Sequence, residues 1–117
     1  MDALCRKDGA WRASLLDPSG YPTPETSGTA EFTFGIAWGI NNGLLPAAEF
    51  TPVVASGWAW LAGTALHSNG LVGFCQPGGD QPENNFNSSS TTNFCVGQFL
   101  LAAGEVLKLV EQQTVGS

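Results

Sequence analysis

Large apolar side chains recur at helical spacing in three parts of the chain. In residues 26–40 they stand four positions apart, at Phe32, Ile36 and Ile40. The same run also alternates with a period of two, as a strand would, but it is long and its intervening residues are Thr, Gly and Ala. We therefore predict a helix, with Thr26 or Ser27 as its cap and Asn41-Asn42-Gly43 as its stop.

Two further helices are expected, from Pro46 to about His67 and from about Thr91 to Gln112. The predicted buried stripe of the second helix is Val53, Val54, Gly57, Trp58, Leu61 and Leu66. One side of the third helix is marked by Phe94, Gln98, Leu101, Glu105 and Leu109. Short strands are predicted at 10–16 and 71–76, and a long polar loop at 77–93. Residues 1–8 are expected to end a helix or fray, and the tail to be disordered.

This layout repeats along the chain. Gly9 and Gly70 lie 61 positions apart, and Phe32 and Phe94 lie 62 apart. A unit of strand, loop, helix, turn and helix is typical of a toroid of helical hairpins, whose units cannot bury their apolar faces alone. We therefore predict a mainly α single domain over residues 1–117, with short strands in its connecting loops.

The composition limits the classes of partner that this chain is expected to bind. Hydrophobic residues make up 43% of the chain and charged residues 12%, so we expect apolar surface that a second copy covers in a homo-oligomer. With four Lys or Arg and a net charge of −6, the chain lacks the basic footprint of a nucleic-acid or anionic-membrane binder. We expect no membrane helix, because Gly, Asn or Pro interrupts every long apolar run. The N-terminus lacks a signal peptide's apolar core, and a cytoplasmic and a secreted location of the parent protein both stay open.

The three cysteines leave two alternatives open. Cys75 and Cys95 flank the polar loop and could form a disulfide worth about 3 kcal/mol, with Cys5 unpaired. Alternatively, all three are reduced and act as small apolar residues. Since CxxC pairs are absent and His67 is the single histidine, we predict no metal site and expect His67 to cap a helix.

Four residues near the first helix are candidates for sugar binding: Trp11, Arg12, Glu25 and Ser27. The ring of Trp11 could stack on a pyranose or belong to the core. The planar fork of Arg12 could bind an acidic sugar's carboxylate or be a surface charge. Glu25 precedes the predicted cap and could face a cleft or simply stabilise the helix. Asp8 and Asp17 fall in turns, where Asp usually serves the backbone.

Several segments carry a family resemblance: DGAWRASLLDP, PETSGTAEFTFGIAWGINNGLL, LVGFCQPGGD and VGQFLLAAGEVLKL. Over about residues 8–110 they resemble the last third of unsaturated rhamnogalacturonyl hydrolases, family 105 of the glycoside hydrolases, which are close to unsaturated glucuronyl hydrolases. The resemblance implies part of an (α/α)6 toroid. It also implies an acidic oligosaccharide substrate from pectin and no cofactor.

The family's catalytic Asp, which protonates the sugar's double bond and directs water to it, lies in the N-terminal half and has no counterpart here. We therefore leave enzymatic activity open and assign no catalytic residue. Two other functions compete with the resemblance: a carbohydrate-binding module without catalysis, and a self-assembling helical protein.

Overall fold

A computed structural model of the chain describes residues 7–115, with side chains to Thr114. The expectations for residues 1–6, including Cys5, and for 116–117 fall outside this range. The predicted disordered tail is partly wrong, because the last helix continues through residues 113–115.

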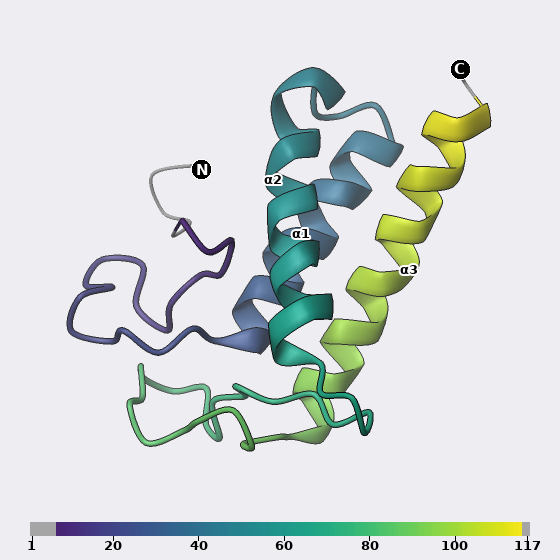
Figure 1. The fold of residues 1–117 in the computed structure, drawn as a ribbon. Coiled ribbons are helices and arrows are strands. Elements are labelled where there is room, and N and C mark those ends of the chain that lie inside the picture. Colours follow the sequence, from purple (N-terminus) through teal and green to yellow (C-terminus); the bar gives the residue numbers. More distant parts are fainter. Residues whose placement is uncertain (1–6, 116–117) are drawn as a thin grey trace.

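The fold is mainly helical, as predicted. The elements are α1 (Thr26–Asn41), α2 (Ala47–Trp60), the short π-helix η1 (Leu61–Ala65) and α3 (Asn93–Val115). Helix α1 packs against both α2 and α3, whereas α2 and α3 barely touch each other (Figure 1). The loop before α1 and the loop before α3 lie at the same end of the helices, the end at which α1 begins (Figure 1).

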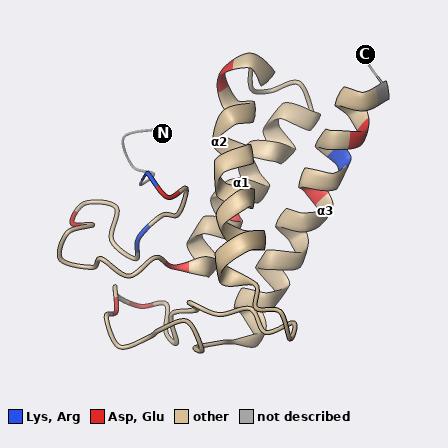
Figure 2. Ribbon diagram, viewed as in Figure 1, with Lys and Arg blue, Asp and Glu red and all other residues tan. Residues whose placement is uncertain are grey.

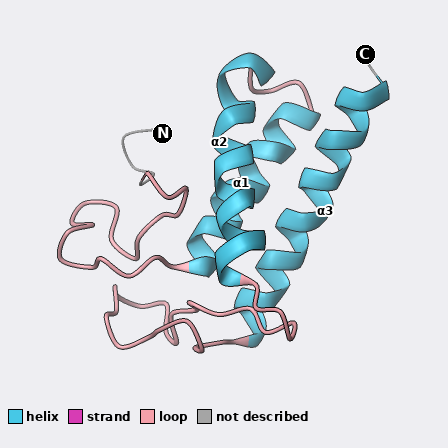
Figure 3. Ribbon diagram, in the orientation of Figure 1, coloured by secondary structure: helices cyan, strands magenta, loops and turns pink. Residues whose placement is uncertain are grey.

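The predicted strands at 10–16 and 71–76 are wrong. Both segments are extended, but each makes one isolated bridge, Arg12 with Pro24 and Leu66 with Val72. A ladder needs a row of donors, and the segment opposite 10–16 contains two prolines, which have no N–H. Between residues 7 and 115 all regular structure is therefore helical (Figure 3).

Helix α1 covers the predicted run, but its cap is Glu25 rather than Thr26 or Ser27. Glu25 has extended backbone angles (φ −121°, ψ 121°), and its carboxylate accepts a hydrogen bond from the Gly28 N–H. Thr26 instead lies fully buried and donates its hydroxyl to the Gly73 carbonyl over 2.6 Å. Because the long side chain of Glu25 caps the first turn of α1, the side chain of Thr26 can bind the loop that precedes α3 instead.

Helices α1 and α2 approach closely at a glycine that the predicted stripe contained. A Cβ on Gly57 would lie 2.4 Å from the Thr33 hydroxyl, so only glycine fits there. Val54, Gly57 and Leu61 of the predicted stripe are buried. The stripe missed Trp60, which is 5% exposed. The α-helical part also ends at Trp60, earlier than the predicted end near His67, because a π-turn takes over.

The core side of α3 differs from the side that we marked. The buried positions are Cys95, Phe99, Ala102, Val106 and Leu109. Of the marked residues only Leu109 is buried, whereas Phe94 and Leu101 are 49% and 56% exposed. Gln98 and Glu105 lie at the border of the core and bind Glu31 and Asn41 of α1. Apolar residues occur on every side of α3, so their spacing alone did not select the buried side.

Helix α3 also meets the length and composition of a membrane span. Within Asn93–Thr114, an 18-residue window has a mean hydropathy of 1.4. The sequence predicted no such segment, because Gly, Asn or Pro interrupts every long apolar run, and α3 meets the criterion in spite of its glycines. Core helices of water-soluble proteins satisfy the same criterion, and the buried side of α3 packs on α1.

Candidate functional site

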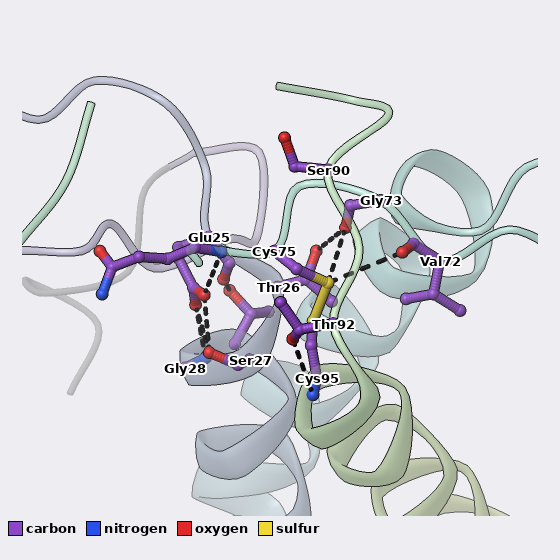
Figure 4. The surroundings of a disulfide bond; sticks show 12 residues. Glu25, Thr26, Ser27, Gly28, Val72, Gly73, Cys75, Ser90, Thr92 and Cys95 are labelled. Atoms are coloured by element: carbon purple, nitrogen blue, oxygen red, sulfur yellow. Dashed lines mark hydrogen bonds between the residues drawn. A yellow bond between two sulfur atoms is a disulfide. The ribbon is translucent and has the colours of Figure 1, made fainter. Parts of the chain in front are cut away.

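Two loops meet at the N-terminal end of α1, and a disulfide holds one of them. Cys75 and Cys95 are bonded, with their Cα atoms 6.0 Å apart, and both are fully buried (Figure 4). The bond ties the segment at 71–76 to the first turn of α3. Of the two alternatives for these cysteines, the structure therefore contains the disulfide and not the reduced thiols.

Glu25 joins three parts of the chain (Figure 4). Its carboxylate accepts hydrogen bonds from the Gly28 N–H at 2.7 Å, the Ser27 hydroxyl at 2.6 Å and the Gln76 N–H at 3.1 Å. Its own N–H donates to the Trp11 carbonyl over 3.0 Å. The side chain is 5% exposed, so these donors replace water around a buried acid. Glu25 thus connects the loop before α1, the helix itself and the disulfide-bonded loop.

The residues next to Glu25 and Gln76 reinforce this connection. The Thr26 N–H donates to the Phe74 carbonyl over 2.8 Å, and the Phe74 N–H donates to the Asn87 carbonyl over 3.1 Å. Phe74 has a φ of 58°, which is unusual for a residue with a side chain. A Cβ on Gly73 would lie 1.7 Å from the Ser88 carbonyl oxygen, so the two limbs of the loop touch there.

His67 binds within this loop and does not cap a helix. Its Nε2 lies 2.6 Å from the Ser88 carbonyl oxygen. The predicted capping role for His67 is therefore wrong. Through this contact the end of the α2–η1 segment also meets the loop.

Arg12 lies in the first loop, and its guanidinium is largely engaged. Nη1 and Nη2 bind the two carboxylate oxygens of Asp8 at 3.0 and 3.1 Å, and Nε donates to the Pro22 carbonyl over 3.0 Å. Burial alone would raise the pKa of Asp8, but hydrogen bonds from Arg12 and Ala10 and the charge of Arg12 outweigh it, so this pKa is lowered. Within residues 7–115 Nη2 makes this one hydrogen bond, so its second N–H has no acceptor among the described residues.

Trp11 belongs to the core. Its side chain is 1% exposed, and its ring centre lies 5.0 Å from that of Phe32. The backbone N–H of Trp11 donates to the Thr29 hydroxyl over 2.9 Å. A covered ring has no open face on which a pyranose could stack. Of the two alternatives predicted for Trp11, sugar stacking and a place in the core, the structure therefore shows the second.

Sequence reasoning missed two contributors to the site. The backbone N–H of Gln76 binds the carboxylate of Glu25, which lies 51 positions earlier in the sequence. The only feature of the sequence that pointed to Gln76 was its position next to Cys75. Asp8 was predicted to serve the backbone, and it does accept a hydrogen bond from Ala10, but it also holds the fork of Arg12. The four-residue spacing of Asp8 and Arg12 was the available signal.

Acidic side chains outnumber basic ones along the chain, and many lie in the two loops (Figure 2). Asp17 accepts a hydrogen bond from the Gly20 N–H, as its predicted turn role requires. No group of three His, Cys, Asp or Glu residues within 7–115 is placed to hold a metal ion. Of the four sugar-binding candidates, the structure brings Arg12, Glu25 and Ser27 to the same end of the helices.

Comparison with known proteins shows to which family this chain belongs. The sequence profile of Glycosyl Hydrolase Family 88 matches residues 1–110, so the chain belongs to that family. This confirms the predicted relationship to the unsaturated uronyl hydrolases.

Two curated relatives carry the same description. The unsaturated 3S-rhamnoglycuronyl hydrolase of Formosa agariphila is 47% identical over 105 residues, and that of Alteromonas sp. is 43% identical over 105 residues. These alignments cover 90% of this chain but 27% and 25% of the relatives. The chain therefore spans about a quarter of the length of the curated relatives that it matches.

Solved structures agree with this assignment. A family 88 glycosyl hydrolase from Bacteroides vulgatus superposes with a TM-score of 0.85 at 45% identity, covering 92% of this chain and 31% of that one. A protein described as a polysaccharide lyase gives the same TM-score and identity. The fold is thus part of the (α/α)6 toroid of family 88, as predicted.

Proposed function

We propose that this chain forms part of the sugar-binding cleft of an unsaturated uronyl hydrolase. The supporting observation is that two relatives described as unsaturated 3S-rhamnoglycuronyl hydrolases are 47% and 43% identical over 90% of the chain. We propose an unsaturated 3S-rhamnoglycuronyl unit as the ligand. An unsaturated rhamnogalacturonan disaccharide is the ligand for comparison with it. This is the pectin-derived sugar expected from the sequence.

Arg12 is the residue that we assign to the sugar's carboxylate. The guanidinium is held rigidly by Asp8 and the Pro22 carbonyl, so little side-chain entropy would be lost on binding. Its free Nη2 N–H can donate to an oxygen of the ligand. Because its side chain is 12% exposed, only one edge of the fork is within reach of a ligand.

Glu25 and Ser27 are assigned a positioning role. The Ser27 hydroxyl donates to Glu25, and the carboxylate in turn fixes Gln76 and the loop around it. These contacts hold the two loops in one arrangement, so that a sugar meets a preformed surface. Trp11 supports the same surface from beneath, since its carbonyl accepts the Glu25 N–H.

Neither Glu25 nor Asp8 suits the role of proton donor. Glu25 already accepts three hydrogen bonds, and the lowered pKa of Asp8 keeps it ionised at neutral pH. We infer that the chain binds and orients the sugar and that a carboxylic acid elsewhere in the complete cleft protonates it. Binding without turnover is therefore expected of the chain by itself.

Calorimetric titration with an unsaturated 3S-rhamnoglycuronyl disaccharide tests this proposal, with double-bond absorbance followed in parallel. We expect binding by the wild-type chain and at least tenfold weaker binding by Arg12→Gln, because a charge-assisted hydrogen bond contributes about 1.5–3 kcal/mol. Lys108→Gln is the matched control, since it removes the same charge from α3. Equal binding by both variants would exclude Arg12, and absence of binding by a folded wild-type chain would overturn the proposed function.

A further inference from the structure

Residues 77–84, which we call the lip, lie between two buried anchors. Before the lip, Cys75 is fully buried in its disulfide with Cys95, and after it Phe86 is 6% exposed. No residue of the lip itself is buried, and its sequence, PGGDQPEN, contains no large apolar side chain. Packing against the core therefore does not fix the shape of the lip, and its two adjacent glycines raise the entropic cost of ordering it. Polar contacts have to hold it instead.

The side chain of Gln76 supplies those contacts. Its Nε2 donates to the Gly78 carbonyl over 2.6 Å, and its Oε1 accepts a hydrogen bond from the Glu83 N–H over 3.0 Å. One amide thus uses both its donor and its acceptor to join positions that are seven apart in the sequence. The backbone N–H of Gln76 binds Glu25, so the same residue connects the lip to the beginning of α1.

The end of the lip contacts the loop that holds Arg12. Nδ2 of Asn84 donates to the Gly20 carbonyl over 3.0 Å, across 64 positions of the sequence. Two positions further along the same loop, the Pro22 carbonyl accepts the Nε–H of Arg12 over 3.0 Å. Two residues of extended chain span at most about 7 Å, so the lip ends close to the guanidinium of Arg12. The segment from Gly20 to Pro22 is therefore held both by Arg12 and by the lip.

We propose that Gln76 is a positioning residue of the sugar-binding surface: its side chain shapes the lip, and the lip holds the loop of Arg12 through Asn84. This inference rests on the proposed function. A sugar that binds Arg12 then meets loops that are already ordered, which lowers the entropic cost of binding. A merely structural role for Gln76 would lower the stability of the fold and leave the affinity of the folded chain for sugar unchanged.

Gln76→Met tests the proposal, because it keeps the length of the side chain, removes both of its hydrogen bonds and leaves the backbone N–H for Glu25. Gln81→Met is the matched control, since Gln81 is exposed in the same lip and its side chain makes no hydrogen bond within residues 7–115. In calorimetric titration with the unsaturated 3S-rhamnoglycuronyl disaccharide, we expect a dissociation constant about tenfold higher for Gln76→Met and an unchanged one for Gln81→Met.

Two further measurements test the steps between Gln76 and Arg12. Asn84→Ala removes the contact with Gly20 and should also weaken sugar binding, whereas Asn85→Ala, at the exposed neighbouring position, should bind as the wild type does. Hydrogen exchange at the Glu83 amide gives a readout without sugar. It should be faster in Gln76→Met, where this N–H loses its acceptor, and unchanged in Gln81→Met.

The outcomes separate this inference from the proposed function. If folded Gln76→Met or folded Asn84→Ala binds the sugar as tightly as the wild type, the positioning role is overturned and the proposed function stands. Unchanged exchange at the Glu83 amide in Gln76→Met would overturn the role as well. A folded wild-type chain that binds no sugar would overturn both. Far-ultraviolet circular dichroism verifies that each variant is folded, and Asn84→Ala decides the matter if Gln76→Met is not.

Discussion

Removing the carboxylate of Glu25 should loosen the joint between the two loops. Glu25→Ala deletes the acceptor for Ser27, Gly28 and Gln76. Hydrogen bonds to charged groups contribute about 1.5–3 kcal/mol each, but the three donors are only partly buried and regain some water, so the full sum is not lost. A lost helix cap alone costs about 1 kcal/mol. We expect Glu25→Ala to lower the free energy of unfolding by about 3 kcal/mol.

Glu25→Gln should have a smaller effect. One oxygen of the amide still accepts a hydrogen bond, whereas the NH₂ group faces a donor, so we expect a loss of about 1–2 kcal/mol. Urea unfolding at 25 °C measures both variants. Hydrogen exchange at the Gln76 and Gly28 amides gives a local readout, because both N–H groups lose their acceptor.

Glu49→Gln is the control for this experiment. Glu49 is an exposed glutamate in the first turn of α2, so its substitution should change stability by no more than about 0.5 kcal/mol. If Glu25→Ala were as stable as Glu49→Gln and its amides stayed protected, the carboxylate would not hold the loops. The positioning role assigned to Glu25 would then be wrong.

Three further perturbations test other parts of the structure. Replacing Cys75 and Cys95 by Ala should lower the free energy of unfolding by about 3 kcal/mol, since the bond closes a loop with a sequence separation of 20; an unchanged urea midpoint would contradict this. Gly73→Ala should cost about 1–3 kcal/mol, because its Cβ would meet the opposite limb of the loop, and full native stability would disprove that contact. Asp8→Asn should destabilise the chain at neutral pH. Because the folded state lowers the pKa of Asp8, its carboxylate contributes to stability above the unfolded pKa of about 3.9, and this contribution is lost as the pH falls through the folded pKa. The free energies of unfolding of wild type and variant, measured in urea, should therefore converge at acid pH. A difference that stays constant with pH would exclude this linkage with Arg12.

The sequence predicted the helices well, because their apolar spacing and end signals are local. The run at 26–40 became α1, and the stop at Asn41-Asn42-Gly43 coincides with its end. The two predicted strands failed because pairing depends on a distant segment. Pro22 and Pro24 removed the donors that the partner of 10–16 would have needed.

The candidate site was predictable only in part. Arg12, Glu25 and Ser27 were found because they border the start of α1, but the burial of Trp11 follows from its contact with Phe32, which local sequence does not reveal. The partner Gln76 lies 51 positions from Glu25, so local sequence did not reveal it either. The disulfide was one of two open alternatives, and the 6.0 Å separation of its Cα atoms shows that the fold brings both cysteines together.

The location of the sugar site can be tested most directly by nuclear magnetic resonance. Titration of the ¹⁵N-labelled chain with an unsaturated 3S-rhamnoglycuronyl disaccharide should shift amide signals in residues 8–27 and 71–92, with the largest changes around Arg12. The signals of residues 104–114 of α3 should stay in place. Absence of shifts in a folded sample, or shifts concentrated on α3, would contradict the account that the two loops form the sugar-binding surface.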